Sequence, residues 1–344
     1  MGRVPTGGSL LCPEVPLSDF SAPRPPAVTD RRAFLRLFPG ALALGAGLAA
    51  PGGLARAEGG GQLHVGNQKG GLRSLIEASG NGGGLPFGLR WSEFQSAAPI
   101  LESINAGALD VGYTGDFSVL TVFGNGAPIR AIAAVRNAPA GQAIVVRDSS
   151  SIRSVADLRG KTVAGTRGGW GEFLIKAALK EAGVDPKEVN IRFMAPPEAL
   201  PAFSGGRIDA WAIWDPFISQ VVLRAGARVL RDGQGLTPSI MLLVASQAAI
   251  AGKRAQLAVF RDRVRKGIDW INGNIPAYAA YNSHLTGMPE EVLLRAFDVN
   301  RASNARIDGA LVAELQRAAD QATAFGVFDR KIDVAPLLDV SFQS

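Results

Sequence analysis

The amino-acid sequence predicts an α/β protein in which two similar α/β lobes are joined by two crossover strands. Strand-like and helix-like segments alternate from residue 62 to residue 245, which is typical of mostly parallel sheets with covering helices. The order of these segments recurs after about 98 residues. The chain has 344 residues, of which 47% are apolar, so it can bury a hydrophobic core in each lobe.

The first 57 residues are predicted to be an export signal of the twin-arginine type, which is removed from the mature chain. Arg31 and Arg32 are followed by a mildly apolar run at residues 41–50, and residues 55–57 have the small-x-small pattern of a cleavage site. A membrane anchor is the alternative, but ten weakly apolar residues are too few to span a bilayer. We therefore expect cleavage near Ala57 and a mature protein in the periplasm.

Composition argues against several classes of protein. The net charge is +6, and the chain contains no block of five or more basic residues, which argues against a dedicated nucleic-acid binder. The single cysteine, Cys12, lies in the predicted signal, so the mature chain would have neither a disulfide nor thiol chemistry. Gly or Pro interrupts every long apolar stretch, which argues against an integral membrane protein.

Each element of the first unit is indicated by its local pattern. Short apolar or alternating runs predict strands, and apolar residues three or four positions apart predict helices. The expected order is a strand at 63–66, a helix at 72–79, a strand at 87–94, a helix at 97–106, a strand at 109–113 and a helix from Asp116 to about residue 124.

The second unit repeats this order, with a strand at 161–164 that leads into a glycine pair and a helix at 171–182. Three pairs of segments carry the repeat at an offset of 98 or 99 residues: 69–71 with 167–169, 107–111 with 206–210, and Asp116 with Asp215. The alternative is that two unrelated α/β stretches share short glycine-containing turns. The repeat favours two units of one design in tandem.

Two crossings connect the predicted units. Strand-like runs flank the first crossing at residues 137–141, and apolar runs interrupted by Gly and Pro mark the second between residues 228 and 246. We therefore assign residues 58–143 and 238–344 to lobe 1 and residues 144–237 to lobe 2.

The two glycine pairs are candidates for binding an anion. Gly168 and Gly169 follow a strand and open a helix, so their backbone N–H groups and the helix dipole could hold an oxyanion. The alternative is a plain tight turn that needs glycine only for its backbone shape. Trp170, which comes next, is either a lid over a ligand or a surface anchor.

Asp116 and Asp215 each follow a strand and begin a helix, so each is either an N-cap or a residue that faces a ligand. Pro216 then takes the first helical position after Asp215. Trp211 and Trp214 are three residues apart and are expected on opposite faces of a strand, one in the core and the other facing a cleft.

Enzyme machinery is largely missing from the sequence. His64 lies in a predicted strand and is expected to be packed, and His284 lies in a polar loop within a segment, residues 254–325, that is otherwise helical by period. The chain contains no GxSxG, HExxH or Walker motif and no acidic cluster with EF-hand spacing. We therefore expect no catalytic residue, no metal site and no cofactor.

Five sequence blocks, in a fixed order, carry a family resemblance. They are Gln68-Lys69-Gly70-Gly71, Trp91-Ser92-Glu93-Phe94, residues 105–116, residues 157–161 and residues 209–216. Together they resemble the aliphatic sulfonate-binding proteins of ABC importers, within the nitrate, sulfonate and taurine group. The resemblance covers about residues 62–335.

This resemblance implies a two-lobed periplasmic binding protein fold (type II) that closes on its ligand by a hinge motion. By matching positions, it also implies a ligand shell, which consists of Gln68, Thr114, Gly115, Asp116, Gly168, Gly169, Trp170, Trp214 and Asp215. Helix N-terminal N–H groups suit a sulfonate, which has three acceptor oxygens.

The sequence departs from the family pattern at two places. Asn67 stands where members usually have Tyr, and Gly169-Trp170 replaces two serines whose hydroxyls could hold an anion. A larger or aromatic anion that stacks on Trp170 therefore competes with a simple alkanesulfonate. The two aspartates would repel an anion unless they are protonated, paired or bound to a cationic part of the ligand.

The sequence thus predicts a monomeric extracytoplasmic solute-binding protein that takes a small sulfonate-like anion, serves sulfur metabolism and delivers its ligand to ABC permease and ATPase subunits. One alternative is an enzyme on the same scaffold, either a desulfinase or a relative of a thiamine-pyrimidine synthase. The absence of cysteine from the mature chain disfavours both. Another alternative is a ligand-sensing module.

Overall fold

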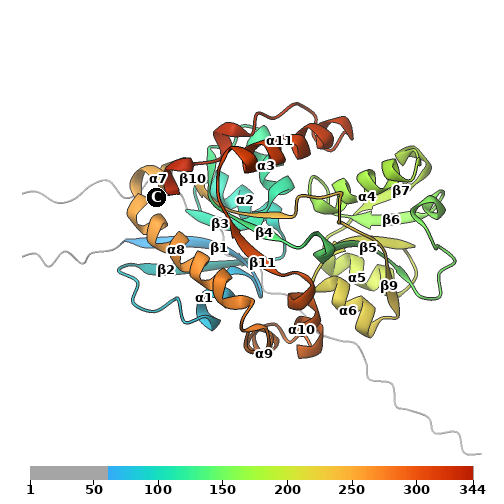
Figure 1. Ribbon diagram of the computed structural model, residues 1–344, viewed down its shortest axis with the longest axis horizontal. Helices are drawn as coiled ribbons and strands as arrows, with labels where there is room; N and C mark the ends of the chain where they lie inside the picture. The colour runs from blue at the N-terminus through green and yellow to red at the C-terminus, as the bar shows by residue number, and fades with distance from the viewer. Residues whose placement is uncertain (1–60, 344) are drawn as a thin grey trace, which may run out of the picture. The chain divides into compact units, whose positions relative to one another are not determined.

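Two β-sheets with helices on both faces form the framework of the protein (Figure 1). The computed structural model describes residues 61–343. The arrangement confirms the predicted class, an α/β fold of two lobes. The predicted export signal, residues 1–57, and its Cys12 lie outside the described residues.

The first sheet has six strands in the spatial order β11, β4, β10, β3, β1, β2. Its strands are β1 (Gln62–Gln68), β2 (Gly88–Phe94), β3 (Val111–Gly115), β4 (Ile129–Asn137), β10 (Ile240–Ser246) and β11 (Ala302–Ala305). Strand β1 is parallel to both β2 and β3, whereas β10 is antiparallel to β3 and β4. The carboxyl ends of β1 and β3 therefore lie at the same edge of the sheet.

The second sheet has five strands in the spatial order β7, β6, β8, β5, β9. Its strands are β5 (Gln142–Arg147), β6 (Thr162–Gly165), β7 (Asn190–Phe193), β8 (Ala210–Trp214) and β9 (Ala227–Asp232). Strand β6 is parallel to β7 and β8, and β5 is antiparallel to β8 and β9. The parallel core with an antiparallel neighbour repeats the design of the first sheet.

Eleven α-helices cover the two sheets in the described part of the chain. They are α1 (Leu72–Ala78), α2 (Ala97–Asn105), α3 (Asp116–Gly124), α4 (Trp170–Glu181), α5 (Pro196–Ser204), α6 (Phe217–Arg224), α7 (Gln247–Gly252), α8 (Arg254–Ile271), α9 (Ile275–Thr286), α10 (Glu290–Val299) and α11 (Gly309–Ala324). Helices α2, α3 and α11 pack on one face of the first sheet, and α1 and α8 pack on the other. Helix α4 covers one face of the second sheet, and α5 and α6 cover the opposite face.

Alternation within the central strands explains why both faces of each sheet are buried. In β10, Leu242 and Val244 join the hydrophobic cluster under α2 and α3, whereas Leu243 and Ala245 join the cluster under α1 and α8. A strand that is apolar at every position has apolar side chains on both faces, so helices must cover both sides of the sheet to bury them. The near-continuous apolar runs in the sequence follow from this requirement.

The chain passes between the two sheets twice. It leaves the first sheet after Asn137 and enters the second at Gln142, and it returns between Asp232 and Ile240. The two passages touch, because the backbone N–H of Asn137 donates to the carbonyl of Ser239 at 2.9 Å. The connection between the lobes is therefore a pair of hydrogen-bonded segments rather than two independent linkers.

Several local expectations were wrong. The segment at 254–325 is not helical throughout, because β11 adds an edge strand to the first sheet; its Ala-Ser-Asn-Ala sequence has no apolar alternation to reveal it. His284 lies within α9, because the helix continues through buried Asn282. His64 is half-buried rather than packed, and its ring nitrogen lies 3.3 Å from the side-chain oxygen of Gln62.

Within residues 61–343, no helix combines the length and the apolar character that crossing a membrane requires.

Candidate functional site

The predicted ligand residues lie at or just after the carboxyl ends of parallel strands. Gln68 ends β1 and Gly115 ends β3, while Trp214 ends β8 and Gly168 follows β6. Open α/β sheets bind ligands outside the carboxyl ends of their strands, where loops and helix N-termini meet. The fold therefore places all nine predicted residues in the region where this class of sheet presents a site.

Asp116 is the most deeply buried of the predicted residues, with no exposed surface. Its carboxylate accepts hydrogen bonds from the backbone N–H groups of Phe117 at 2.7 Å and Ile240 at 3.1 Å, and from the indole of Trp170. Burial raises the pKa of Asp116 to about 7, although these three donors oppose the shift. The carboxyl is thus poised to exchange a proton near neutral pH. It is the first residue of α3, and Gly115 is the cap.

Trp170 joins the two sheets. It is the first residue of α4, a helix of the second lobe, and its indole nitrogen donates to Asp116 of the first lobe. Its ring also lies against Gly115, where an added Cβ atom would come within 2.9 Å of Trp170 Cζ2. Trp170 is half-buried, so it is not a surface anchor; it covers the carboxyl end of β3.

The Gly168-Gly169 turn already holds an oxyanion, which belongs to its own helix. The backbone N–H of Gly168 donates to the carboxylate of Glu172 at 2.9 Å, and Glu172 is also paired with Lys176 at 2.7 Å. Gly168 has a φ of +63°, which requires glycine, and its carbonyl accepts a hydrogen bond from Thr121 of the first lobe at 2.8 Å. The turn therefore has the anion-binding chemistry that its sequence predicts, with an internal carboxylate in place.

Asp215 combines features of a cap and of a ligand-facing residue. One oxygen accepts hydrogen bonds from the backbone N–H of Ser219 at 2.9 Å and from its hydroxyl at 2.6 Å. Its other oxygen is buried without a hydrogen-bond partner among the described residues. Burial raises the pKa of Asp215, and the nearby Arg295 guanidinium opposes part of that shift. The sequence predicted Pro216 as the first residue of α6, but in the structure it is the N-cap of this helix.

One of the two tryptophans of β8 lies in the core as expected, but the other packs against the same hydrophobic cluster. Trp211 is buried and Trp214 is half-buried, but both rings contact Phe217, with ring centroids 5.9 Å and 6.3 Å apart. The expectation of opposite faces fails because Trp214 is the last strand residue, and Phe217 lies just beyond it where the chain turns into α6.

Gln68 and Thr114 are predicted ligand residues in strands β1 and β3 of the first sheet. Gln68 is half-buried, and its carbonyl accepts the N–H of Gly71 at 2.8 Å, which closes the turn into α1. The hydroxyl of Thr114 is buried and has no hydrogen-bond partner among the described residues. Asn67, which stands where the family usually has Tyr, is buried, and its amide nitrogen is also without a partner there. A buried polar group without a partner is costly, so these atoms are candidates to contact a ligand.

Sequence reasoning missed three residues that link the site. Gln142 pairs with Trp214 across β5 and β8, and its amide donates to the hydroxyl of Ser239 at 3.0 Å. Ser239 precedes Ile240, whose N–H binds Asp116. Polar residues inside two apolar crossing segments were the available signal for Gln142 and Ser239. Arg295 gave no such signal, because nothing in its surrounding sequence indicates that it reaches the second lobe.

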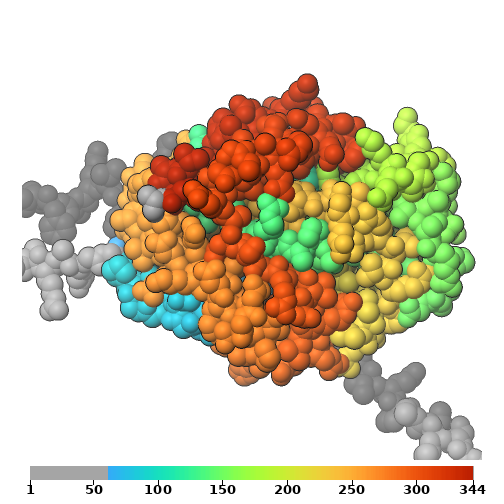
Figure 2. Space-filling view, in the orientation of Figure 1, coloured from blue at the N-terminus to red at the C-terminus, as the bar shows by residue number. Residues whose placement is uncertain are grey.

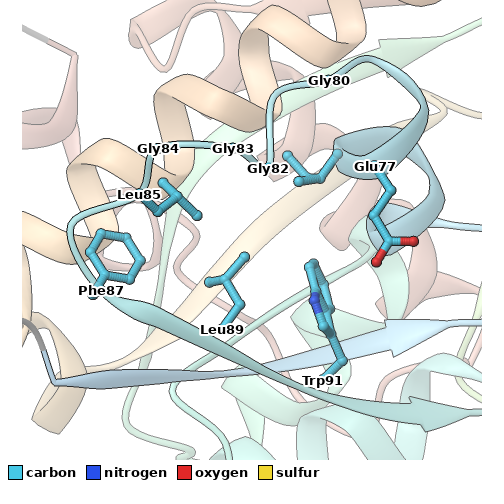
Figure 3. A pocket seen from close by; sticks show the side chains of 10 residues that line it. Glu77, Gly80, Gly82, Gly83, Gly84, Leu85, Phe87, Leu89 and Trp91 are labelled. Carbon is cyan, nitrogen blue, oxygen red and sulfur yellow. The ribbon is translucent and has the colours of Figure 1, made fainter.

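Two surface pockets lie away from these residues. One, of about 520 Å³, is lined by Glu77, Leu85, Phe87, Leu89 and Trp91 beneath a glycine-rich loop, and Figure 3 shows these side chains around a common space. The other, of about 570 Å³, lies on the second lobe beside Arg192 and Met194. None of the nine predicted ligand residues lines either pocket.

The described residues contain no group of three or more His, Cys, Asp or Glu side chains placed to hold a metal ion.

Comparisons with known proteins give a consistent picture. A family model described as "NMT1/THI5 like" matches residues 92–274, which is more than half of the chain. A protein of Bacillus subtilis (strain 168) named as an aliphatic sulfonates-binding protein is 26% identical over 284 residues, covering 81% of this chain and 83% of that protein. An Escherichia coli (strain K12) protein with the same name is 36% identical over 148 residues, which is 43% of this chain and 46% of that protein. The latter match thus spans about half the length of the relative.

Solved structures agree with the sequence matches. The alkanesulfonate-binding protein SsuA from Xanthomonas axonopodis pv. citri, solved with bound MOPS, is 26% identical and superposes with a TM-score of 0.75. The superposition covers 81% of this chain and 98% of that structure. The family resemblance noted from the five sequence blocks is confirmed by these matches.

Proposed function

The chain belongs to the NMT1/THI5-like family, and from this premise we propose that it is an extracytoplasmic solute-binding protein of an ABC importer. Its ligand is a small organic anion, most simply an aliphatic sulfonate or a related organosulfur compound. The protein acts in the periplasm after export, as a monomer, and delivers the ligand to a membrane permease with its ATPase subunits. The Bacillus subtilis and Escherichia coli relatives described above are named as binding proteins.

The observation that carries this proposal is the contact between the lobes at the carboxyl ends of their strands. Trp170 of the second lobe donates to Asp116 of the first, and Thr121 of the first lobe donates to Gly168 of the second. A ligand held between residues 144–237 and the rest of the mature chain would touch these groups as the lobes close. The ligand shell that we propose is the set of nine residues named from the sequence.

The electrostatics of the site suit an anion better than the sequence suggested. Burial raises the pKa of both aspartates, for Asp116 to about 7, so Asp116 repels an anion less at neutral pH than an exposed aspartate does. The N–H of Gly168 already donates to a carboxylate, which is an oxyanion like a sulfonate. An incoming sulfonate would compete with Glu172 for this donor.

The desulfinase alternative lacks the cysteine nucleophile that its reaction needs. A desulfinase of this scaffold needs a nucleophilic cysteine, and the only cysteine of the chain, Cys12, lies in the predicted export signal. No feature of the described site favours the sensing alternative over import. We therefore assign no catalytic role to any residue.

A thermal-shift screen of the purified protein tests the proposal. The panel contains alkanesulfonates, arylsulfonates, taurine, sulfate esters, nitrate and thiamine precursors. A ligand at about 100 times its dissociation constant adds about 2.7 kcal/mol to the free energy of unfolding, which is a measurable shift. A response to sulfonates that is lost in Trp170→Ala supports the site. Stabilisation by nitrate or thiamine precursors alone would overturn the proposed ligand class.

A further inference from the structure

Helix α10 makes a non-covalent bridge to the second lobe. It follows α9 in the C-terminal part of the chain, and Figure 2 shows the orange atoms of this part meeting the yellow atoms of the second lobe. Two side-chain contacts join it to α6. Arg295 donates to the hydroxyl of Ser219 at 2.8 Å, and Glu291 pairs with Arg224 at 2.8 Å.

These two contacts differ in burial. Arg224 and Glu291 are both more than half exposed, so their pair is a surface ion pair that contributes little to stability. Ser219 has no exposed surface, and its hydroxyl links the Arg295 guanidinium to the Asp215 carboxylate. The contact of Arg295 therefore extends into the proposed ligand site, whereas that of Arg224 ends at the surface.

The hydrogen bonds of Ser219 fix which oxygen of Asp215 is occupied. Its hydroxyl accepts from Arg295, so its own proton is directed to Asp215 Oδ1, which also accepts the Ser219 backbone N–H. Asp215 Oδ2 is left without a partner among the described residues, although the side chain is nine-tenths buried. A buried carboxylate oxygen without a donor is costly, and a ligand that brings a donor removes that cost.

We propose that Arg295 is a positioning residue for the ligand: through Ser219 it orients the Asp215 carboxylate so that Oδ2 remains available to a hydrogen-bond donor of the ligand. This inference rests on the proposed function. Arg295 itself does not touch the ligand in this arrangement. It supplies both the orientation of Asp215 and a positive charge close to it.

Arg295 is the charged side chain that affects the ionisation of Asp215. Strand β8 ends at Trp214, directly before Asp215, and Gln142 of the neighbouring strand β5 pairs with Trp214; neither side chain carries a charge. On α6 the charged residue is Arg224, which pairs with Glu291 of α10 at the surface. The guanidinium of Arg295 is the charge that opposes the upward shift in the pKa of Asp215.

A ¹³C-carboxyl NMR titration of Asp215 tests the positioning role without a ligand. The resonance is assigned with Asp215→Asn, and its midpoint is compared in the wild type, Arg295→Met, Arg295→Lys and Arg224→Gln. We expect Arg295→Met to move the midpoint to higher pH, because the nearby cation is lost. Arg295→Lys should stay closer to the wild type. Arg224→Gln, the matched control on the same interface, should leave the midpoint unchanged.

Calorimetric titration with two probes completes the test. 2-Aminoethanesulfonate carries a donor and ethanesulfonate does not. Arg295→Met should weaken binding of the first about tenfold, the scale of a lost charge-assisted hydrogen bond, and weaken binding of the second less. Equal losses for both probes, an unmoved midpoint in Arg295→Met, or an equal shift in Arg224→Gln would overturn the positioning role. If the wild type binds neither probe, the proposed sulfonate function fails, while the NMR midpoints still decide whether Arg295 controls Asp215.

Discussion

Replacing Asp116 by asparagine allows two contributions to stability to be measured separately: the hydrogen bonds of this buried side chain and its ionisation. The side chain accepts two backbone N–H groups and the indole N–H of Trp170. An asparagine oxygen can still accept from Phe117 and Trp170, but its amide nitrogen would face the N–H of Ile240. The lost acceptor gives a cost of about 1–3 kcal/mol that does not depend on pH.

The ionisation of Asp116 gives a second contribution that does depend on pH. Burial raises its pKa to about 7 from the usual 3.8, and each unit corresponds to about 1.4 kcal/mol, so charging this group in the folded protein costs about 4 kcal/mol. The folded state holds the proton more tightly than the unfolded state does. The free energy of unfolding therefore falls as the pH rises from about 4 to about 7, and the loss is complete above the folded pKa.

Urea unfolding at pH 4.5, 6, 7 and 8 measures this effect. We expect the unfolding free energy of the wild type to fall by about 3 kcal/mol more than that of Asp116→Asn across this range, because about 1 kcal/mol of the effect is already lost below pH 4.5. Asp329→Asn, at an exposed position of the same lobe, is the control and should keep the wild-type slope. A constant difference between the wild type and Asp116→Asn at all four pH values would refute the reasoning, because it would mean that Asp116 does not titrate in this interval.

Two further substitutions test the contacts between the lobes. Gly115→Ala would place a Cβ atom 2.9 Å from the ring of Trp170, so the free energy of unfolding should fall by about 1–3 kcal/mol, whereas Gly309→Ala, where an added Cβ meets nothing within 4 Å, should not destabilise the protein. Equal stability of the two variants would contradict the tight contact. Glu172→Gln removes the carboxylate bound to the N–H of Gly168, so calorimetry should show tighter sulfonate binding than in the wild type; weaker binding would mean that the anion does not use this turn.

The sequence predicted those parts of the fold that depend on neighbours along the chain. The apolar runs of β1, β6 and β10 and the glycine turns after β1 and β6 are local patterns, and the structure has an element or a turn at each. The sequence did not predict strand β11, because this short polar segment forms a strand only by pairing with the edge of β4. The sequence also did not predict that α9 continues through His284, because the burial of Asn282 depends on tertiary packing.

The candidate site divides in the same way. The positions of Gly168, Asp116 and Asp215 after their strands could be read from the sequence, because strand ends and helix starts have local signatures. Their partners could not. Asp116 and Trp170 are 54 positions apart, and Asp215 is linked to Arg295 through a hydroxyl on a different helix. Glu172 is the intermediate case, since an acidic residue in the first turn of a helix commonly reaches back to a backbone N–H.

By itself, the sequence determined the class of the fold and the family and predicted the positions of a ligand site, because these follow from local periodicity and from short motifs in a fixed order. Only the tertiary structure decided which groups meet there. It buried both aspartates, set Trp170 against Asp116, gave the N–H of Gly168 to Glu172 and brought Arg295 to Ser219. Burial and pairing depend on residues far apart in the chain, and they determine the charge of the candidate site.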